Sequence, residues 1–386
     1  MATVAAQQWA SEAFDRSAAY VQDNRTASVI AGVGAVASIT YLLTRKRRGY
    51  HSKPTSFELS GGSLDRAEVE DSVKGYYDAF STLERGKGAQ MARKEKVVDL
   101  VDKFYSLVTD LYEWGWGQSF HFSPKLPIRD WSGSEAAHEA RIGAILGLAP
   151  GKTALDCGCG VGGPMRTIAA ASGGNVTGIT INGYQVKRAT YHNEKVGLEK
   201  QCRVVQGNFL EMPFEPNSFD GAYAIEATCH AAKLEDVYGE IYRVLKPGAT
   251  FVSYEWVTTK RFDGTNKDEQ AIIDEIIIGN GLPEMRTWRE AEQAGKSVGF
   301  KLVHSRDLAE DSKGANGPWY GRLTVMGKPV FMINAAIVSV LEFLRIAPKG
   351  MGQVHKMLVD TAFALIDGGE KGIFTPMHML VFQKPE

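Results

Sequence analysis

The sequence predicts an α/β fold: a Rossmann-like, doubly wound parallel sheet with a helical extension before it and further elements after it. Short apolar segments alternate with helical patterns over residues 150–258. The first of these segments, residues 153–155, runs into a turn with glycines at alternate positions, Gly158, Gly160 and Gly162. A strand, a glycine-rich turn and a helix in this order build a nucleotide-binding site, because glycine lets a ligand lie directly against the backbone.

The residues around this turn distinguish between cofactor classes. A dinucleotide site has an acidic residue about 20 positions downstream, and residues 176–182 hold none. No Gly-Lys-Ser or Gly-Lys-Thr sequence ends the turn, which excludes a P-loop. Asp156, directly before the glycines, resembles the acid of the S-adenosylmethionine (SAM) loop in class I methyltransferases. We therefore predict a SAM-binding methyltransferase core over residues 150–258, with a tight turn in another α/β domain as the alternative.

Composition excludes other classes of protein. The 386 residues can bury a full core. A net charge of −1 and the lack of a basic block in the body of the chain argue against a nucleic-acid partner. Four cysteines make no disulfide framework in a chain of this size. Two of them, Cys157 and Cys159, lie in the glycine turn without a second Cys or His pair at ligand spacing, so we expect no metal site.

The N-terminal region predicts a membrane anchor. After a polar tail at residues 1–25, residues 26–44 form an uncharged run of 19 residues, just long enough to span a bilayer as a helix. The basic sequence Arg-Lys-Arg-Arg at 45–48 begins a linker over residues 45–64 and predicts that this side faces the cytosol. We expect the catalytic body at the cytosolic face of the endoplasmic reticulum membrane. An interfacial helix or a leader segment is the alternative.

Residues 65–149 are predicted to be helical apart from one aromatic segment, residues 112–122. This segment reads Tyr-Glu-Trp-Gly-Trp-Gly-Gln-Ser-Phe-His-Phe, and two glycines so close together do not fit a plain core helix. It is either a packing cluster over the nucleotide domain or the wall of an apolar ligand pocket, with Glu113 and His121 as its polar groups. The candidate substrate-binding residues are Tyr112, Trp114, Trp116, Phe120 and Phe122.

The remaining core elements follow in order. In doubly wound sheets, ligands bind outside the carboxyl ends of the strands, so the residues at these ends are site candidates. After a helix at 135–148, the pattern predicts strands at 176–180, 202–206, 218–225 and 250–256 and helices at 183–193 and 237–245.

The strand ends supply the predicted cofactor contacts. Asp156 is expected to orient the methionyl amine, while Asn182 and Gln185 replace the missing ribose acid. Asn208 is expected to bind the adenine, with Phe209 packed on it. The candidate cofactor-binding residues are Asp156, Gly158, Gly160, Gly162, Thr180, Asn182, Gln185, Asn208, Phe209 and Glu226.

The C-terminal region, residues 259–386, continues the α/β pattern. We expect a pocket lid or a membrane-lying face at 330–346, which is strongly apolar but carries two charges. The other predicted elements are helices at 272–278 and 290–298, a strand at 300–305 and a closing strand at 372–382.

These motifs together resemble the sterol 24-C-methyltransferases, from about Pro54 to Pro385. The resemblance rests on the aromatic segment 112–122, the glycine turn, Ile-Glu-Ala-Thr-Cys-His at 225–230 and Ile-Phe-Thr-Pro at 373–376. The form of the aromatic segment is similar to the plant branch that performs the second methylation. Gly183 departs from the acid usual in that family.

The resemblance implies methyl transfer from SAM to the side-chain alkene of a sterol, either cycloartenol or a 24-methylene sterol. Attack by the alkene leaves a carbocation, which the aromatic faces stabilise by about 0.5–2 kcal/mol each. A base then removes a proton. The candidate catalytic residues are Glu113, Glu226, His121, Tyr112, Tyr223, Cys229 and His230.

Other readings stay open at this point. Cys229 and His230 are equally explained by packing beside the cofactor. The enzyme alternatives are SAM methyltransferases of other lipids, a tocopherol-type enzyme or a cyclopropane fatty-acid synthase, and the non-enzyme alternative is a catalytically silent sterol-binding protein. The sequence leaves open which sterol is the acceptor, whether one or two methyls are added, and whether the chain forms a homo-oligomer.

Overall fold

The computed structural model describes residues 116–312, 316–345 and 350–386, and eight positions before them: 74–75, 101–102, 105, 109 and 112–113. The predicted tail, anchor and linker at 1–64 lie outside the described residues, as does Trp114. In the described ranges, none of the helices combines the length and apolar character that crossing a membrane requires.

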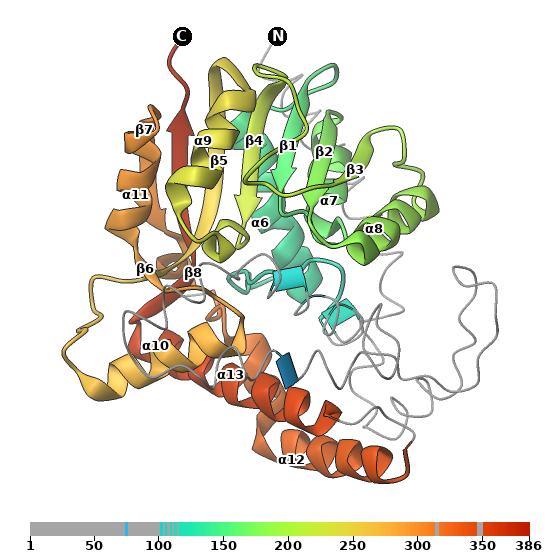
Figure 1. The fold of residues 1–386 in the computed structure, drawn as a ribbon, viewed down its shortest axis with the longest axis vertical. Coiled ribbons are helices and arrows are strands. Elements are labelled where there is room, and N and C mark those ends of the chain that lie inside the picture. Colours follow the sequence, from blue (N-terminus) through green and yellow to red (C-terminus); the bar gives the residue numbers. More distant parts are fainter. Residues whose placement is uncertain are drawn as a thin grey trace.

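The core is a single mixed sheet with the strand order β3-β2-β1-β4-β5-β8-β7 (Figure 1). Its first five strands run parallel, and the chain order reverses between β1 and β4, which is where open α/β sheets bind ligands. The parallel strands are β1 (Thr153–Cys157), β2 (Asn175–Thr180), β3 (Cys202–Gln206), β4 (Phe219–Ile225) and β5 (Leu245–Thr258). The predicted doubly wound fold is confirmed.

The end of the chain extends this sheet with antiparallel strands. β8 (Phe374–Gln383) pairs with β5, and β7 (Lys301–Asp307) pairs with β8, while the short β6 (Arg286–Thr287) adds to the end of β5. β8 is almost entirely buried because it lies between β5 and β7, and most of its residues are accordingly apolar.

Helices cover both faces of the sheet, and the hydrophobic core is accordingly divided in two. One cluster contains Ile142 of α6 (Trp131–Leu146) and Ile168 of α7 (Gly163–Ser172). The other contains Ile241 of α9 (Leu234–Val244) and Ala294 of α11 (Trp288–Ser297). α8 (Gly183–Lys195) packs beside β3 at the sheet edge.

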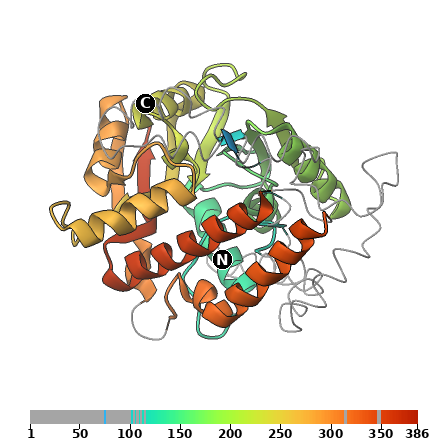
Figure 2. The same ribbon diagram turned by 60° about the horizontal axis from the view of Figure 1, so that its bottom comes forward.

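Three helices form a separate layer at the carboxyl ends of the parallel strands (Figures 1 and 2). They are α10 (Lys267–Gly279), α12 (Gly321–Phe343) and α13 (Met351–Lys371), and α13 packs against both others. α12 begins nine residues before the predicted apolar segment, because Pro329 lies inside the helix instead of at its start. α13 was not predicted from the sequence, although its buried residues Val354, Met357 and Leu365 follow a helical spacing.

Candidate active site

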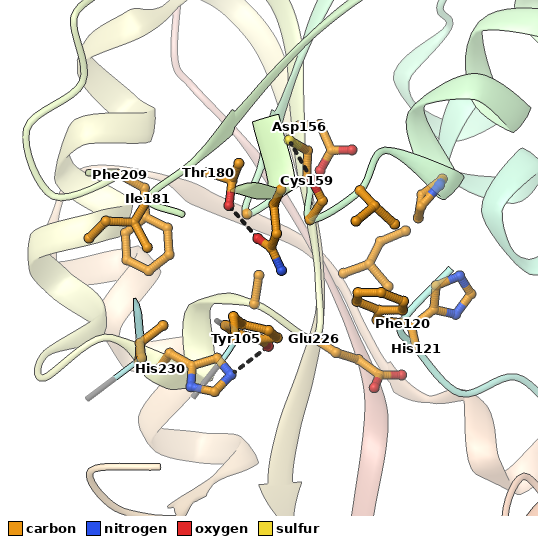
Figure 3. A pocket seen from close by; sticks show the side chains of 18 of the residues that line it. Tyr105, Phe120, His121, Asp156, Cys159, Thr180, Ile181, Phe209, Glu226 and His230 are labelled. Carbon is orange, nitrogen blue, oxygen red and sulfur yellow. Dashed lines mark hydrogen bonds between the residues drawn. The ribbon is translucent and has the colours of Figure 1, made fainter. Parts of the chain in front are cut away.

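A pocket opens at the carboxyl ends of the parallel strands (Figure 3). It brings together many of the predicted site residues with parts of the aromatic segment. Strand ends and the turns after them contribute Asp156, Gly158, Gly160, Thr180, Ile181, Asn208, Phe209, Ile225, Glu226 and His230, and residues before α6 contribute Tyr105, Gln118, Phe120 and His121.

The glycine turn has the geometry that close backbone approach requires. Gly158 has a φ of 82°, and a Cβ there would lie 2.4 Å from the Cβ of Ala227. Gly160 also has a positive φ, and a Cβ on it would project into the pocket, 3.8 Å from Phe120. At Gly163 a Cβ would meet the Gln118 carbonyl oxygen at 2.2 Å, so the aromatic segment lies directly against this turn. The turn therefore forms a cradle that side chains would fill.

The groups that line the pocket beside the glycine turn fit SAM. The acid Asp156 lies at one side, whereas Ile181, Phe209 and Leu210 offer apolar surface to an adenine beside the polar Asn208. Buried Tyr223, which does not line the pocket, donates a hydrogen bond to Asp156 Oδ2 at 2.9 Å.

The two residues expected at the ribose, Asn182 and Gln185, are placed differently. Gln185 lines the pocket, and its Oε1 accepts a hydrogen bond from the Thr180 hydroxyl at 2.7 Å (Figure 3). Asn182 is not among the described residues that line it. Its Oδ1 caps α8 by accepting from the Gln185 backbone N–H, and its Nδ2 donates to Asp102 Oδ1 at 2.8 Å. Asn182 thus shapes the helix that carries Gln185.

Glu226 occupies a constrained position directly after β4. Its φ of 54° lies in the left-handed region, which a side chain seldom adopts without compensation from its surroundings. Its two oxygens each accept a hydrogen bond at 2.8 Å, one from the Phe122 backbone N–H and one from Trp256 Nε1. Burial raises the pKa of Glu226 to about 8. This strained, buried acid in a ligand pocket is a strong candidate for function.

His121 is held as a fixed cation. Its Nε2 lies 2.8 Å from Glu139 Oε1 and its Nδ1 lies 2.9 Å from the Phe122 carbonyl oxygen. Both neighbours are acceptors, so both ring nitrogens donate. Burial lowers the pKa of His121, but the hydrogen bond and charge of Glu139 outweigh it and raise the pKa to about 9. His121 therefore has no free lone pair with which to take a proton.

Glu113 lies outside the set of described pocket-lining residues. Its carboxylate binds Arg188 through two hydrogen bonds of 2.6 and 2.9 Å and His192 Nε2 at 2.6 Å. Burial raises the pKa of Glu113, but hydrogen bonds from His192 and Arg188 lower it to about 2. The ionised side chain ties the aromatic segment to α8.

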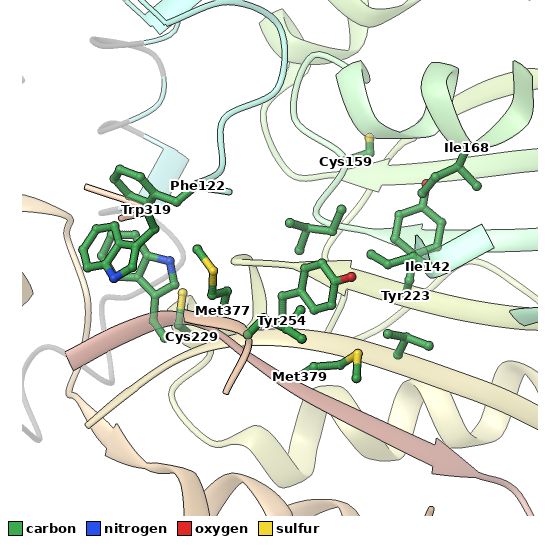
Figure 4. Close-up of a cluster of buried hydrophobic side chains, with 14 of the residues drawn as sticks. Phe122, Ile142, Cys159, Ile168, Tyr223, Cys229, Tyr254, Trp319, Met377 and Met379 are labelled. Atoms are coloured by element: carbon green, nitrogen blue, oxygen red, sulfur yellow. The ribbon is translucent and has the colours of Figure 1, made fainter. Parts of the chain in front are cut away.

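The aromatic segment contributes both to the pocket lining and to a packing cluster, the two structures that the sequence offered as alternatives. Phe120 lines the pocket, and Tyr112 packs edge-on against it with ring centroids 5.4 Å apart. Phe122 instead packs against Trp116, Trp256 and Trp319, and Figure 4 shows it beside Trp319 in a buried cluster. The pocket wall and the packing cluster are thus made by alternate parts of one segment.

Two further predicted residues lie close together after β4. The Cys229 thiol donates to the Glu226 carbonyl oxygen at 3.4 Å, and burial raises its pKa well above the usual value. His230 lines the pocket, and its Nε2 lies 3.2 Å from the Tyr105 hydroxyl. Burial lowers the pKa of His230 to about 4, so its ring is neutral.

Several site residues had no signal in the sequence. Tyr105 stands in an ordinary amphipathic stretch, and Glu139 lies within a predicted helix. Arg322 comes from α12, far along the chain; its guanidinium lies over the Trp116 ring at 4.3 Å and binds Glu135. Only the tertiary fold brings these groups together.

Comparison with known proteins identifies the family. Residues 155–253 match the family described as "Methyltransferase domain", and residues 321–386 match "Sterol methyltransferase C-terminal". The chain is 48% identical over 361 residues to 24-methylenesterol C-methyltransferase 3 of Arabidopsis thaliana, covering 94% of this chain and 97% of the relative. The chain belongs to the sterol 24-C-methyltransferase family. It is a SAM-dependent methyltransferase, as the sequence predicted.

Other relatives and solved structures are consistent with this assignment. 24-methylenesterol C-methyltransferase 2 of Oryza sativa subsp. japonica is 52% identical over 85% of this chain and 89% of its own length. Squalene methyltransferase 2 of Botryococcus braunii is 45% identical, covering 92% and 94%. The [4+2]-cyclase SpnF is 21% identical with a TM-score of 0.56, covering 75% of this chain and 96% of its own. Geranyl diphosphate methyltransferase in complex with SAM is 18% identical with a TM-score of 0.53, covering 69% and 98%. The two structures show the shared fold.

Proposed function

We propose that this enzyme transfers a methyl group from SAM to the side-chain alkene of a 24-methylene sterol. The observation that carries the proposal is one pocket with two unlike ends. Figure 3 shows Asp156 and Cys159 of the glycine turn at one end, and Phe120, Tyr105 and Glu226 at the other. Relatives that are 48–52% identical and bear the name 24-methylenesterol C-methyltransferase support the choice of acceptor.

The residues of the pocket account for the chemistry. Bound SAM supplies an electrophilic methyl group that carries its own leaving group. An alkene is a weak nucleophile, so the protein must align it and exclude water, which the apolar wall of Phe120 and Ile225 does. The ring of Phe120 offers its π face to the cation that forms on the acceptor. Glu226 in its carboxylate form adds a negative charge at the same end.

Labelled SAM tests the proposal directly. The purified protein is incubated with methyl-labelled SAM and either cycloartenol or 24-methylenelophenol. We expect label in the sterol fraction from the 24-methylene acceptor. Label from cycloartenol alone would assign the first methylation, and label from both would assign both steps to one enzyme. Label from neither would contradict sterol methylation.

A linear triterpene is the second candidate acceptor. Squalene methyltransferase 2 and botryococcene C-methyltransferase of Botryococcus braunii are 45% and 44% identical, and each match covers 92% of this chain. Squalene also presents an alkene and no polar group for the pocket to bind. Squalene as a third acceptor in the same assay distinguishes the two, because label in squalene alone would favour this candidate.

We also propose that the enzyme works at the cytosolic face of the endoplasmic reticulum membrane. The uncharged run 26–44 and the basic sequence after it support an N-terminal anchor. At the end of α12, Val340, Phe343 and Leu344 are exposed apolar side chains suited to a lipid surface. Protease treatment of sealed microsomes should degrade the catalytic body; protection of that body would place it on the opposite side.

A further inference from the structure

The end of the pocket away from Asp156, where the alkene is proposed to bind, is called the acceptor end. It holds a pair of groups to which the proposed mechanism assigns no role. Figure 3 shows Tyr105 and His230 hydrogen-bonded to each other at the end away from Asp156, with Glu226 on the other side of Tyr105. The Tyr105 hydroxyl lies 3.2 Å from His230 Nε2, and the rings meet edge-on with centroids 5.7 Å apart. Both side chains line the pocket, and His230 is 8% exposed.

The proton that leaves the methylated cation needs an acceptor with an available lone pair. His121 offers none, because both of its nitrogens donate. Glu226 is held by one N–H donor on each oxygen, and the proposed mechanism already assigns its carboxylate to stabilising the cation. Glu113 is bound to Arg188 and His192 and is not among the described lining residues. Among the titratable side chains described at this end, Tyr105 and His230 are left.

The ionisation states of this pair suit a relay. Burial lowers the pKa of His230, so the ring is neutral, and in the tautomer protonated at Nδ1 its Nε2 accepts the Tyr105 hydroxyl. Burial raises the pKa of Tyr105, with Tyr112, Cys229 and Glu226 adding to the effect, so Tyr105 remains a phenol. The phenol oxygen is then a neutral acceptor whose own proton already points at a base.

We propose that Tyr105 and His230 together accept the proton that ends the reaction. The C–H bond next to the cationic carbon breaks, and its electron pair forms the new C=C bond. The proton goes to Tyr105 Oη while the phenol proton passes to His230 Nε2, which leaves a neutral alkene, a phenol and an imidazolium. After product release, the imidazolium returns its proton to water. The relay rests on the proposed function only in requiring an alkene acceptor.

The energetics favour this direction. A hydrogen beside a carbocation is extremely acidic, so even an imidazole with a lowered pKa is a sufficient base. The burial that lowers the pKa of His230 also makes the imidazolium unstable in the closed pocket, which promotes its deprotonation once water enters.

Removal of the phenol hydroxyl tests the relay. Tyr105→Phe keeps the ring but removes the group that takes the proton, so kcat should fall by about 100-fold, the low end for general base catalysis. SAM affinity should stay within about threefold, and the alkene product should give way to an alcohol formed by water capture. Tyr254→Phe is the matched control, because Tyr254 is a buried tyrosine whose hydroxyl donates to the His138 carbonyl outside the pocket.

A double-variant cycle separates the relay from a purely structural role. His230→Gln keeps a hydrogen-bond acceptor for Tyr105 but cannot hold the proton, so its kcat should fall about as far as that of Tyr105→Phe. Residues that act as one unit give non-additive losses, so the double variant should be no worse than either single variant. Additive losses, or a wild-type rate and alkene yield in Tyr105→Phe, would overturn the proposal.

The labelling assay with alternative acceptors distinguishes a failure of the proposed relay from a failure of the proposed function. Kinetics are measured on whichever alkene acquires label from SAM. Label in squalene alone would contradict the sterol assignment but leave the relay fully testable. Label in the 24-methylene sterol with unchanged Tyr105→Phe kinetics would contradict the relay alone. Absence of label from every alkene would contradict both.

Discussion

The two ends of the pocket are built in different ways. At the cofactor end, the glycine turn and the strand ends β1 to β4 lie within one continuous segment of the chain, and backbone shape does much of the recognition. At the acceptor end, Tyr105 and Phe120 precede α6 and line the pocket with His230, which follows β4, and these residues act through their side chains. A local motif therefore specifies the first end, whereas the second depends on tertiary packing.

The two buried acids of the pocket show the same contrast. Asp156 sits in regular β1 backbone with the Tyr223 phenol as a partner, and burial raises its pKa to about 7. Glu226 takes a left-handed conformation and is held by two N–H donors from distant segments, Phe122 and Trp256. At the acceptor end, a strained backbone conformation thus positions the carboxyl group of Glu226. At the cofactor end, Asp156 is positioned without such strain.

The largest effect is expected from the glycine turn. In Gly158→Ala the new Cβ would collide with Ala227 at a backbone φ of 82°, so SAM affinity should fall by more than about 100-fold as the cradle deforms. Gly147→Ala is the matched control: its φ is also positive, but open space surrounds it outside the pocket. Titration calorimetry with SAM measures both. Equal affinities for the two variants would show that backbone shape is unimportant at this end.

The next effect is expected at Glu226. Glu226→Gln preserves the shape but turns an amide NH₂ toward one of the two N–H donors and removes the charge, so kcat should fall by about 100-fold with SAM affinity nearly unchanged. At saturating SAM, the wild-type rate should rise with pH through about 8 as the carboxylate forms.

Glu255→Gln controls for the loss of a buried acid. Glu255 is as deeply buried on β5, where it accepts from Tyr238 and Ser253 away from the pocket. We expect this variant to lose stability but to keep the wild-type pH profile. A flat profile in the wild type would remove the Glu226 charge from the mechanism.

The sequence predicted the cofactor end well for a physical reason. Short apolar runs and glycine positions are local properties, so the predicted strand 202–206 has the bounds of β3 and the predicted strand 176–180 is one residue shorter than β2. Helix α13 was missed because glycines and polar residues interrupt its apolar pattern. Local periodicity therefore predicts the fold class even though it does not reveal one of the helices.

The acceptor end was only partly predictable. Glu113 stands beside pocket aromatics in the sequence, but its side chain turns to Arg188 and His192 on α8. Tyr105 lacks any motif, since one tyrosine in an amphipathic stretch carries no chemical signature. Residues that are adjacent in an irregular segment can direct their side chains to different sides. Their roles can therefore be assigned only when the tertiary contacts are known.

A smaller effect is expected at Glu113, which supports the acceptor end from outside. Glu113→Gln breaks the partly buried contacts with Arg188 and His192, so stability should fall by about 2 kcal/mol and kcat by less than tenfold. Because its pKa is lowered to about 2, the stabilisation in the wild type should be lost as pH falls from about 4.5 toward 2. Glu240→Gln, in a more exposed Glu–Arg pair on α9, should cost about 1 kcal/mol or less. A kcat loss as large as that of Glu226→Gln would instead place Glu113 in the chemistry.

The smallest effect is expected on stability, where the cost of burying the Glu226 carboxylate can be measured separately from its contribution to catalysis. Its pKa is raised from the usual 4.5 to about 8, so the folded state binds more protons than the unfolded state between these values. Stability should therefore decrease as pH rises through this window. Asp156 contributes in the same direction, so the comparison must be between wild type and Glu226→Gln. Thermal unfolding at pH 5.5 and 8.5 should show a Tm that drops more in the wild type, by a few degrees. Parallel Tm curves for the two proteins would mean that the Glu226 carboxylate costs the folded state no stability. The left-handed backbone at Glu226 would then need an explanation other than the placement of a destabilising charge.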